Sequence, residues 1–174
     1  LARELGFDNI NMDLIVGLPG EEYGQVEHTM KEVTALDPDS ITVHSLAVKR
    51  AARLNMFKDQ YKEMTFTNNQ QIMEMTARYA YQAGHSPYYL YRQKNMAGNF
   101  ENVGYAKPDS AGIYNILIME EKQSILALGA GATSKKVTGE LIQRTENVKD
   151  IKNYVERIDE MIERKRLLME TDSQ

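Results

Sequence analysis

The most constraining feature of this sequence is the stretch NINMDLIVGLPGEE, residues 9–22. Apolar and polar residues alternate in it, as on an extended strand with one buried face. The apolar side carries Ile10, Met12, Leu14 and Val16, and the polar side carries Asn9, Asn11 and Asp13. Because a carboxylate is costly to desolvate without a partner, we expect Asn11 and Asp13 to face a wet cleft. A solvated edge strand would explain the same pattern.

The next segments predict a βαβ unit. Apolar residues recur at helical spacing over residues 22–36, the DPDS sequence ends that helix, and residues 40–47 follow as a second strand. Such a unit has parallel neighbouring strands and a right-handed crossover. A helix over residues 68–83, capped by Gly84, and an aromatic strand in SPYYLYRQK, residues 86–94, predict a second such unit. Residues 48–66 have no clear period and are interpreted as a loop or short irregular helix.

The remaining segments are shorter. Residues 1–7 are interpreted as a last helical turn closed by Gly6, so we expect the chain to begin inside a domain. Residues 95–112 are rich in Gly and Asn and predict a long loop. Residues 113–120 and 123–136 are interpreted as short strands, residues 135–144 as a hairpin turning at Thr138 and Gly139, and residues 147–168 as a closing amphipathic helix.

These elements favour an α/β fold. The repeated βα units match the later part of an incomplete TIM-like barrel, because too few strands are present to close an eight-stranded one. We expect residues 1–112 to form this half-barrel with a substrate-side loop, and residues 113–174 a small α+β extension. Loops after parallel strands converge on one rim, where Asp13, Ala47 and Arg92 are placed.

Composition excludes several function classes. A net charge of −4 and a pI near 5.5 argue against nucleic acid or an anionic membrane as the main partner. The absence of cysteine excludes disulfides, thiol catalysis and cysteine-bound metal within these residues. The three histidines, His28, His44 and His85, lack ligand spacing, so no metal site is expected. No apolar stretch is long enough to span a bilayer, and we expect a cytoplasmic location.

The order of several motifs resembles one enzyme family. The stretches GFDNINMDLIVGLPGE, DPDSITVHSLA, YYLYRQKNMAGN and ILALGAGATS follow each other as in radical S-adenosylmethionine enzymes of the oxygen-independent coproporphyrinogen III oxidase family, most closely its coproporphyrinogen dehydrogenase branch. The resemblance covers residues 1–135. It implies an oxidoreductase of haem biosynthesis that converts propionates of coproporphyrinogen III into vinyl groups by radical oxidative decarboxylation.

The resemblance also implies cofactor contacts. The family's strand aspartate that contacts S-adenosylmethionine falls on Asp13, with Asn11 beside it, and the next contact, an alanine, falls on Ala47. Thr133, after the glycine-rich LGAGA, is a further predicted contact. The family's C-x3-C-x2-C loop, which holds a [4Fe-4S] cluster, is not in this chain. We therefore expect a C-terminal fragment of a longer enzyme, inactive alone, whose cluster is bound upstream.

The substrate of that family carries four carboxylates, so cationic and amide groups are expected beside it. Arg92, Lys94 and Asn95 are the predicted substrate contacts, and the preceding tyrosines Tyr88, Tyr89 and Tyr91 are predicted to pack a tetrapyrrole. Ordinary core packing and a solvated loop would explain the same residues. Where many relatives have a Tyr-Trp pair, this chain has Tyr105 and Ala106, which weakens the transfer of substrate contacts.

Two alternatives remain at this stage. One is a haem chaperone of the same superfamily, in which His44 or His85 would ligate haem. The other is a cofactor-free interaction module that docks through its methionines and closing helix. An exposed barrel edge also predicts dimerisation of the fragment through strand pairing. The electron donor or acceptor is not predicted.

Overall fold

The computed structural model describes residues 1–47, 59, 68–92, 98 and 100–170. The chain forms two compact units, Leu1–Ile116 and Leu117–Gln174. Residues 48–66, for which a loop or irregular helix is predicted, lie outside the described residues except Asp59, as do Lys94 and Asn95.

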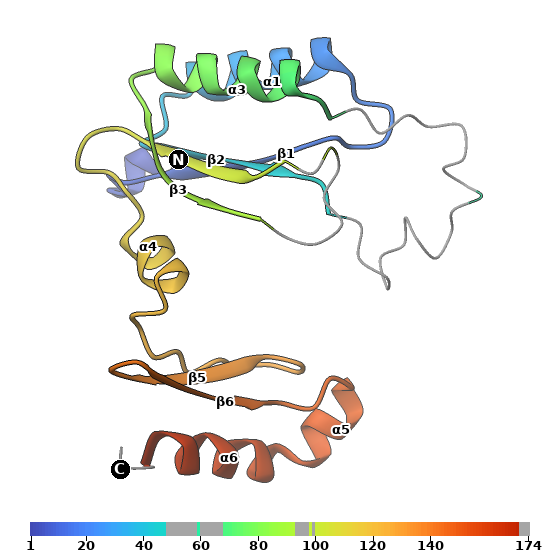
Figure 1. Cartoon of the computed structure of the whole chain (residues 1–174), viewed down its shortest axis with the longest axis vertical. Coiled ribbons are helices and arrows are strands. Elements are labelled where there is room, and N and C mark those ends of the chain that lie inside the picture. Colours follow the sequence, from blue (N-terminus) through green and yellow to red (C-terminus); the bar gives the residue numbers. More distant parts are fainter. Residues whose placement is uncertain (48–58, 60–67, 93–97, 99, 171–174) are drawn as a thin grey trace. The chain divides into compact units, whose positions relative to one another are not determined.

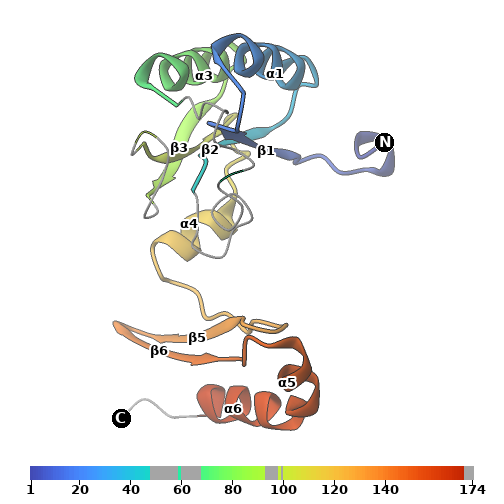
Figure 2. The same ribbon diagram turned by 90° about the vertical axis from the view of Figure 1, so that its right-hand side faces the viewer.

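The first unit is a mixed four-stranded sheet covered on one face by two helices (Figure 1). The strands stand in the order β1 (Asn11–Val16), β2 (Ser40–Ser45), β4 (Asn102–Ala106), β3 (Ser86–Tyr91). Helices α1 (Tyr23–Ala35) and α3 (Gln70–Gln82) lie side by side over that face (Figure 2). Their apolar sides meet the sheet in a core of Val16, Val26, Met30, Val33, Ile41, Val43, Ile72, Met75, Ala80 and Tyr105.

The predicted first βαβ unit is confirmed. Strands β1 and β2 pair in parallel, from Asn11 opposite Ser40 to Val16 opposite Ser45, with α1 between them in sequence. Helix α1 begins at a capping box formed by Glu22 and Gln25. Helix α3 begins at Asn69, whose side chain accepts a hydrogen bond from the Ile72 N–H at 3.0 Å.

The second predicted βαβ unit is wrong in its pairing. Strand β4 lies in the segment predicted as a loop, and it separates β2 from β3 by pairing antiparallel with both. Strands β2 and β3 therefore run in the same direction but are not neighbours. The physical reason is burial, because Tyr105 on β4 contributes to the core and Val103 packs against it.

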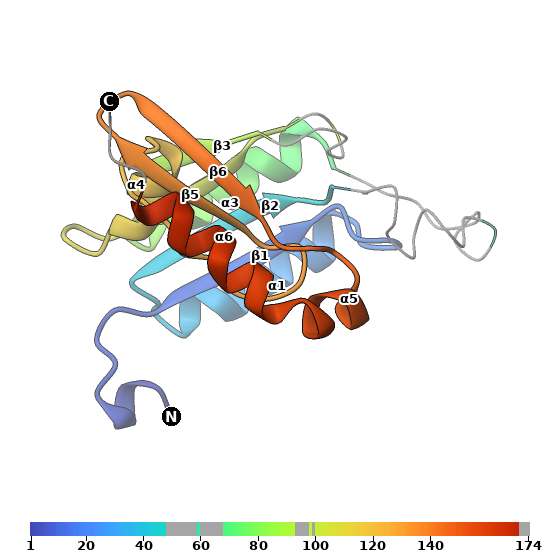
Figure 3. The same cartoon turned by 90° about the horizontal axis from the view of Figure 1, so that it is seen from below.

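The second unit is a hairpin backed by helices. Strands β5 (Thr133–Thr138) and β6 (Leu141–Glu146) pair antiparallel, which confirms the predicted hairpin, and Gly139 in its turn has a φ of +61°. Figure 3 shows α6 (Ile158–Glu170) along this hairpin. The predicted closing helix is divided into α5 (Ile151–Glu156) and α6, which are separated by Arg157.

Two further predictions concern short segments. The predicted strand over residues 113–120 is wrong, since Ile113–Met119 forms helix α4. A short apolar run does not distinguish a strand from a helix, and here the Gly112 carbonyl accepts from the N–H groups of Asn115 and Ile116. At the start of the chain, a short 3-10 helix, η1 (Arg3–Leu5), ends at Gly6 with a φ of +87°, as predicted.

Candidate functional site

The open face of the first sheet, opposite α1 and α3, carries the polar residues of β1. Met12, Leu14 and Val16 pack toward the helical side, so alternation directs Asn11 and Asp13 to the open face. Asn11 Nδ2 donates to Asp13 Oδ1 at 2.6 Å. Asn11 Oδ1 accepts from Ser40 Oγ at 2.9 Å and Thr42 Oγ1 at 3.3 Å. The Asp13 carboxylate is thus anchored through one oxygen while its side chain stays 62% exposed.

His44 on β2 lies next to this carboxylate. Its Nε2 is 3.8 Å from Asp13 Oδ2, and its Nδ1 is 3.1 Å from the hydroxyl oxygen of Tyr91 on β3. The ring of Tyr91 stacks in turn on that of Tyr89, with 6.2 Å between centroids and 4° between planes. A line of polar and aromatic side chains therefore crosses from β1 to β3. The sequence alone suggested a haem-ligand role for His44 but did not place it beside Asp13. The signal was present, because Ser40, Thr42 and His44 alternate along β2 and therefore lie on one face of that strand.

A hollow of about 360 Å³ opens beside this line at the carboxyl ends of β1 and β2. Its lining comprises Asp13, Ile15, His44, Ser45, Leu46, Ala47, Tyr91 and Asn102. The structure thus brings Asp13 and Ala47 together, as their predicted positions at neighbouring strand ends imply. The buried Asn102 accepts a hydrogen bond from the Ser45 N–H at 2.8 Å, which holds the end of β2 against β4. The hollow combines an exposed carboxylate with apolar walls, a combination suited to a polar organic ligand.

The tyrosines of β3 are packed rather than freely solvated. Burial raises the pKa of Tyr89, and a hydrogen bond with Thr42 partly opposes that shift. Tyr89 therefore stays protonated at neutral pH. Tyr88 accepts a hydrogen bond from Asn115 Nδ2 at 2.9 Å.

Arg92 is the one predicted substrate contact of the three that lies among the described residues. Its guanidinium is exposed and pairs with Glu101 Oε1 at 3.1 Å. An exposed pair of this kind contributes little to stability, so Arg92 can exchange Glu101 for another anion at little cost. Lys94 and Asn95 lie outside the described residues, and their roles stay predictions.

Thr133, the remaining predicted cofactor contact, belongs to the second unit. It is the exposed first residue of β5 and pairs in register with Glu146. The preceding glycines Gly129 and Gly131 have φ values of +99° and +72°, so this loop depends on glycine conformations. A cofactor role for Thr133 stays a prediction.

His85 differs from His44 in its surroundings. Its side chain is buried, and Nε2 donates to the Pro38 carbonyl oxygen at 3.0 Å, which joins the start of β3 to the turn before β2. This hydrogen bond and the burial keep the ring away from any external haem, so the alternative in which His85 ligates haem is not supported. Among the described residues, no group of three or more His, Cys, Asp or Glu is arranged to hold a metal ion.

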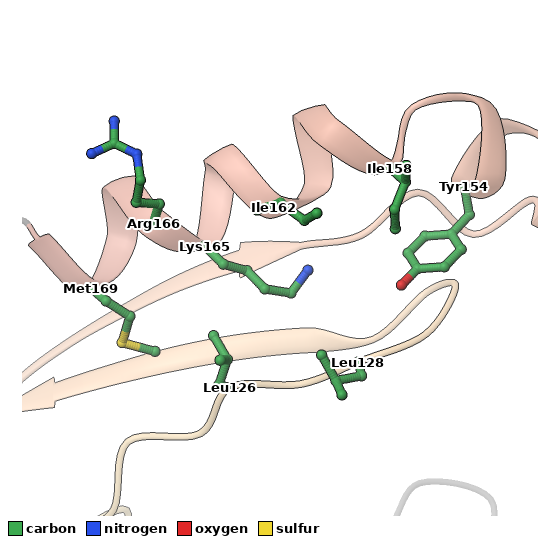
Figure 4. Close-up of a pocket in the computed structure, with 8 residues that line it drawn as sticks. All are labelled: Leu126, Leu128, Tyr154, Ile158, Ile162, Lys165, Arg166 and Met169. Carbon is green, nitrogen blue, oxygen red and sulfur yellow. The ribbon is translucent and has the colours of Figure 1, made fainter.

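The second unit has a larger, mostly apolar hollow of about 540 Å³ between α6, α5 and residues 126–128 (Figure 4). Leu126, Leu128, Ile158 and Ile162 form its walls, and Lys165 extends into it from α6. Lys165 Nζ is tied to Asn147 Oδ1 at 2.6 Å and the Met161 carbonyl oxygen at 3.2 Å. This hollow lacks the carboxylate and the converging polar groups of the first one.

In the part of the chain that the structure describes, no helix has the length and apolar character needed to cross a membrane.

No family model matches the chain. It is 46% identical over 168 residues to the oxygen-independent coproporphyrinogen-III oxidase-like protein HemZ of Bacillus subtilis, a match that covers 95% of this chain and 33% of the relative. The haem chaperone HemW of the same organism is 44% identical over 48 residues, or 28% of this chain and 13% of the relative.

The solved structure of the Escherichia coli coproporphyrinogen III oxidase HemN, described as a radical SAM enzyme, has a TM-score of 0.61 to this chain. It is 23% identical, and the match covers 91% of this chain and 36% of that one. The α/β fold expected for part of such an enzyme is thus confirmed. The chain spans about a third of the length of HemZ. It is a homologue of a segment of the oxygen-independent coproporphyrinogen III oxidase family, as its motifs predicted.

Proposed function

We propose that this chain supplies part of the S-adenosylmethionine-binding face of a radical coproporphyrinogen III oxidase. The observation that carries this proposal is the Asp13 carboxylate, held by Asn11 through one oxygen and exposed at a hollow that also contains Ala47. An anchored carboxylate binds the hydroxyl and amino groups of a nucleoside or amino acid ligand well.

The lining of the hollow fits S-adenosylmethionine chemically. Ile15 and Leu46 offer apolar surface for a flat base, and the small Ala47 side chain leaves room for it near the backbone. Asp13 provides a hydrogen-bonding group in this lining, and Asn11, at the start of β1, contacts the hollow only indirectly by holding that carboxylate. Bound to a [4Fe-4S] cluster, this cofactor supplies the radical that removes a hydrogen atom from a substrate propionate. The chain contains no cysteine, so the cluster ligands would come from elsewhere in the longer protein.

Coproporphyrinogen III is the proposed substrate. Each of two propionates would lose a hydrogen atom, then carbon dioxide and one electron, and that electron would pass to an acceptor outside this chain. The substrate's carboxylates would be met by Arg92, whose pairing with Glu101 is exposed and exchangeable, and by Lys94 and Asn95. The stacked rings of Tyr89 and Tyr91 present an aromatic surface beside the hollow. These substrate contacts rest on the family resemblance and on the position of Arg92 at the end of β3.

The decisive experiment uses the full-length protein that contains this chain, reconstituted with its cluster under anaerobic conditions. Asp13→Asn keeps the size of the side chain but removes its charge. We expect it to weaken S-adenosylmethionine binding about tenfold or more, equivalent to about 1.4 kcal/mol, and to lower coproporphyrinogen III turnover. Asp8→Asn, which neutralises an exposed carboxylate before β1, is the matched control. Unchanged binding in Asp13→Asn would overturn the proposal.

A haem chaperone is the second candidate, because the HemW match exists and His44 faces the hollow. This function predicts a Soret band when the full-length protein is titrated with haem, and loss of that band in His44→Ala. If the protein is instead an oxidase, we expect it to turn over coproporphyrinogen III and to form no specific haem complex through His44.

A further inference from the structure

His44 stands between two groups that constrain its ring from opposite sides. Asp13 Oδ2 lies 3.8 Å from Nε2, and the Tyr91 hydroxyl oxygen lies 3.1 Å from Nδ1. The ring of Tyr91 also meets that of His44 edge-on, with centroids 6.1 Å apart. The three side chains come from β1, β2 and β3, so the sheet itself sets their spacing.

These partners select one tautomer of the neutral imidazole. An ionised carboxylate only accepts hydrogen bonds, so the nitrogen that faces it, Nε2, is favoured to carry the proton. Nδ1 is then an acceptor, and the Tyr91 hydroxyl donates to it. Tyr91 thus holds the His44 ring so that the Nε2–H group of His44 is directed at Asp13.

The separation of His44 and Asp13 leaves one carboxylate oxygen available. At 3.8 Å the Nε2 to Oδ2 contact is longer than a hydrogen bond, although the partial positive charge of the Nε2–H group still attracts the carboxylate. The other oxygen, Oδ1, is already occupied by Asn11. Oδ2 is therefore oriented from one side while it keeps acceptor capacity toward the hollow.

We propose that His44, held by Tyr91, is a positioning residue for Asp13, which it orients so that Oδ2 receives a hydroxyl or ammonium group of the ligand in the hollow. This inference rests on the proposed function for the identity of that ligand. Asn11 and His44 then hold the carboxylate from two sides, and the Tyr91 hydroxyl contributes to this arrangement by holding the His44 ring.

The binding test compares two amides in place of His44 in the full-length protein. Glutamine places its N–H group near the position of Nε2, whereas asparagine reaches only the position of Nδ1. With S-adenosylhomocysteine as probe, we expect His44→Gln to bind within about threefold of the wild type and His44→Asn about tenfold more weakly. Equal losses in the two variants would overturn the inference, because a merely structural role does not distinguish the two amides.

Asp13→Asn separates this inference from the function on which it rests. If His44 acts through Asp13, His44→Asn causes no further loss of affinity in the Asp13→Asn background. A full additional loss there would show that His44 acts independently of Asp13 and would overturn the inference. If the wild type does not bind the probe, or Asp13→Asn binds it equally well, the proposed function fails.

A ligand-free measurement tests the geometry by itself. Nitrogen-15 NMR of the imidazole, assigned by the signal lost in His44→Gln, reports which ring nitrogen carries the proton in the neutral form. We expect the Nε2–H tautomer in the wild type and a larger share of Nδ1–H in Tyr91→Phe. A wild-type ring protonated at Nδ1, or a tautomer unaffected by Tyr91→Phe, would contradict the proposed arrangement whatever the ligand.

Discussion

Gly104 on β4 and Tyr89 on β3 are register partners, and the ring of Tyr89 fills the space where a side chain on residue 104 would lie. A Cβ at that position would also come within 3.1 Å of Tyr88. The missing side chain thus allows the Tyr89 ring to lie against the sheet, where it stacks on Tyr91 beside the candidate cofactor hollow.

Gly104→Ala is therefore expected to displace Tyr89 and to lower the free energy of unfolding by about 1–3 kcal/mol, the usual cost of overpacking. Urea denaturation measures the change. The control is Gly24→Ala in α1, where an added Cβ meets nothing within 4 Å and alanine favours the helix by about 0.5–1 kcal/mol. If Gly104→Ala proved as stable as Gly24→Ala, the steric relationship would be refuted.

Asp39 links pH to the stability of the first unit. Burial on its own raises the pKa of Asp39, but the Ile10 N–H at 2.8 Å and the Arg3 guanidinium at 2.6 Å outweigh it, so the pKa lies below its ordinary value. A lowered folded-state pKa contributes stability above the unfolded value, about 3.9, and that stability is lost as pH falls through the folded pKa.

Asp39→Asn is accordingly expected to lower the free energy of unfolding at pH 7 by about 1–2 kcal/mol, because hydrogen bonds to a charged acceptor are lost. The difference from the wild type should begin to shrink below about pH 4, where the unfolded chain takes up a proton on this carboxyl group, and it should shrink further as pH falls through the lower pKa of the folded state. Unfolding curves across this range, with the exposed Asp8→Asn as comparison, measure it. A difference that persists unchanged in acid would rule out the ionic explanation.

Lys165 and Asn147 form a buried polar pair in the second unit. Asn147 Oδ1 accepts from Lys165 Nζ at 2.6 Å, and Asn147 Nδ2 donates to the Gly129 carbonyl oxygen at 2.7 Å. Asn147→Ala should cost about 1–3 kcal/mol, because a buried ammonium loses an acceptor. In a Lys165→Met background the same substitution should cost less. A double-mutant cycle measures this coupling, and strictly additive effects would argue against the pair.

Periodicity predicted the first strand, helices α1 and α3, the parallel β1–β2 pair and the β5–β6 hairpin. These elements have local signals, namely alternation, capping residues and a Thr-Gly turn, which depend on residues close in sequence. Strand β4 was missed because its five residues include Gly104 and follow a segment rich in glycine and asparagine. Its pairing with β2 and β3 comes from distant residues, which a local pattern does not contain.

The sequence by itself determined that Asn11 and Asp13 share the polar face of a strand, because alternation along an extended chain leaves no other arrangement. The motifs also identified the family correctly. Only the tertiary structure decided that His44 and Tyr91 stand beside Asp13, and that His85 is buried against Pro38. Those contacts join residues 31 to 47 positions apart, and they depend on strand order and register, which the whole sheet sets through long-range pairing and burial.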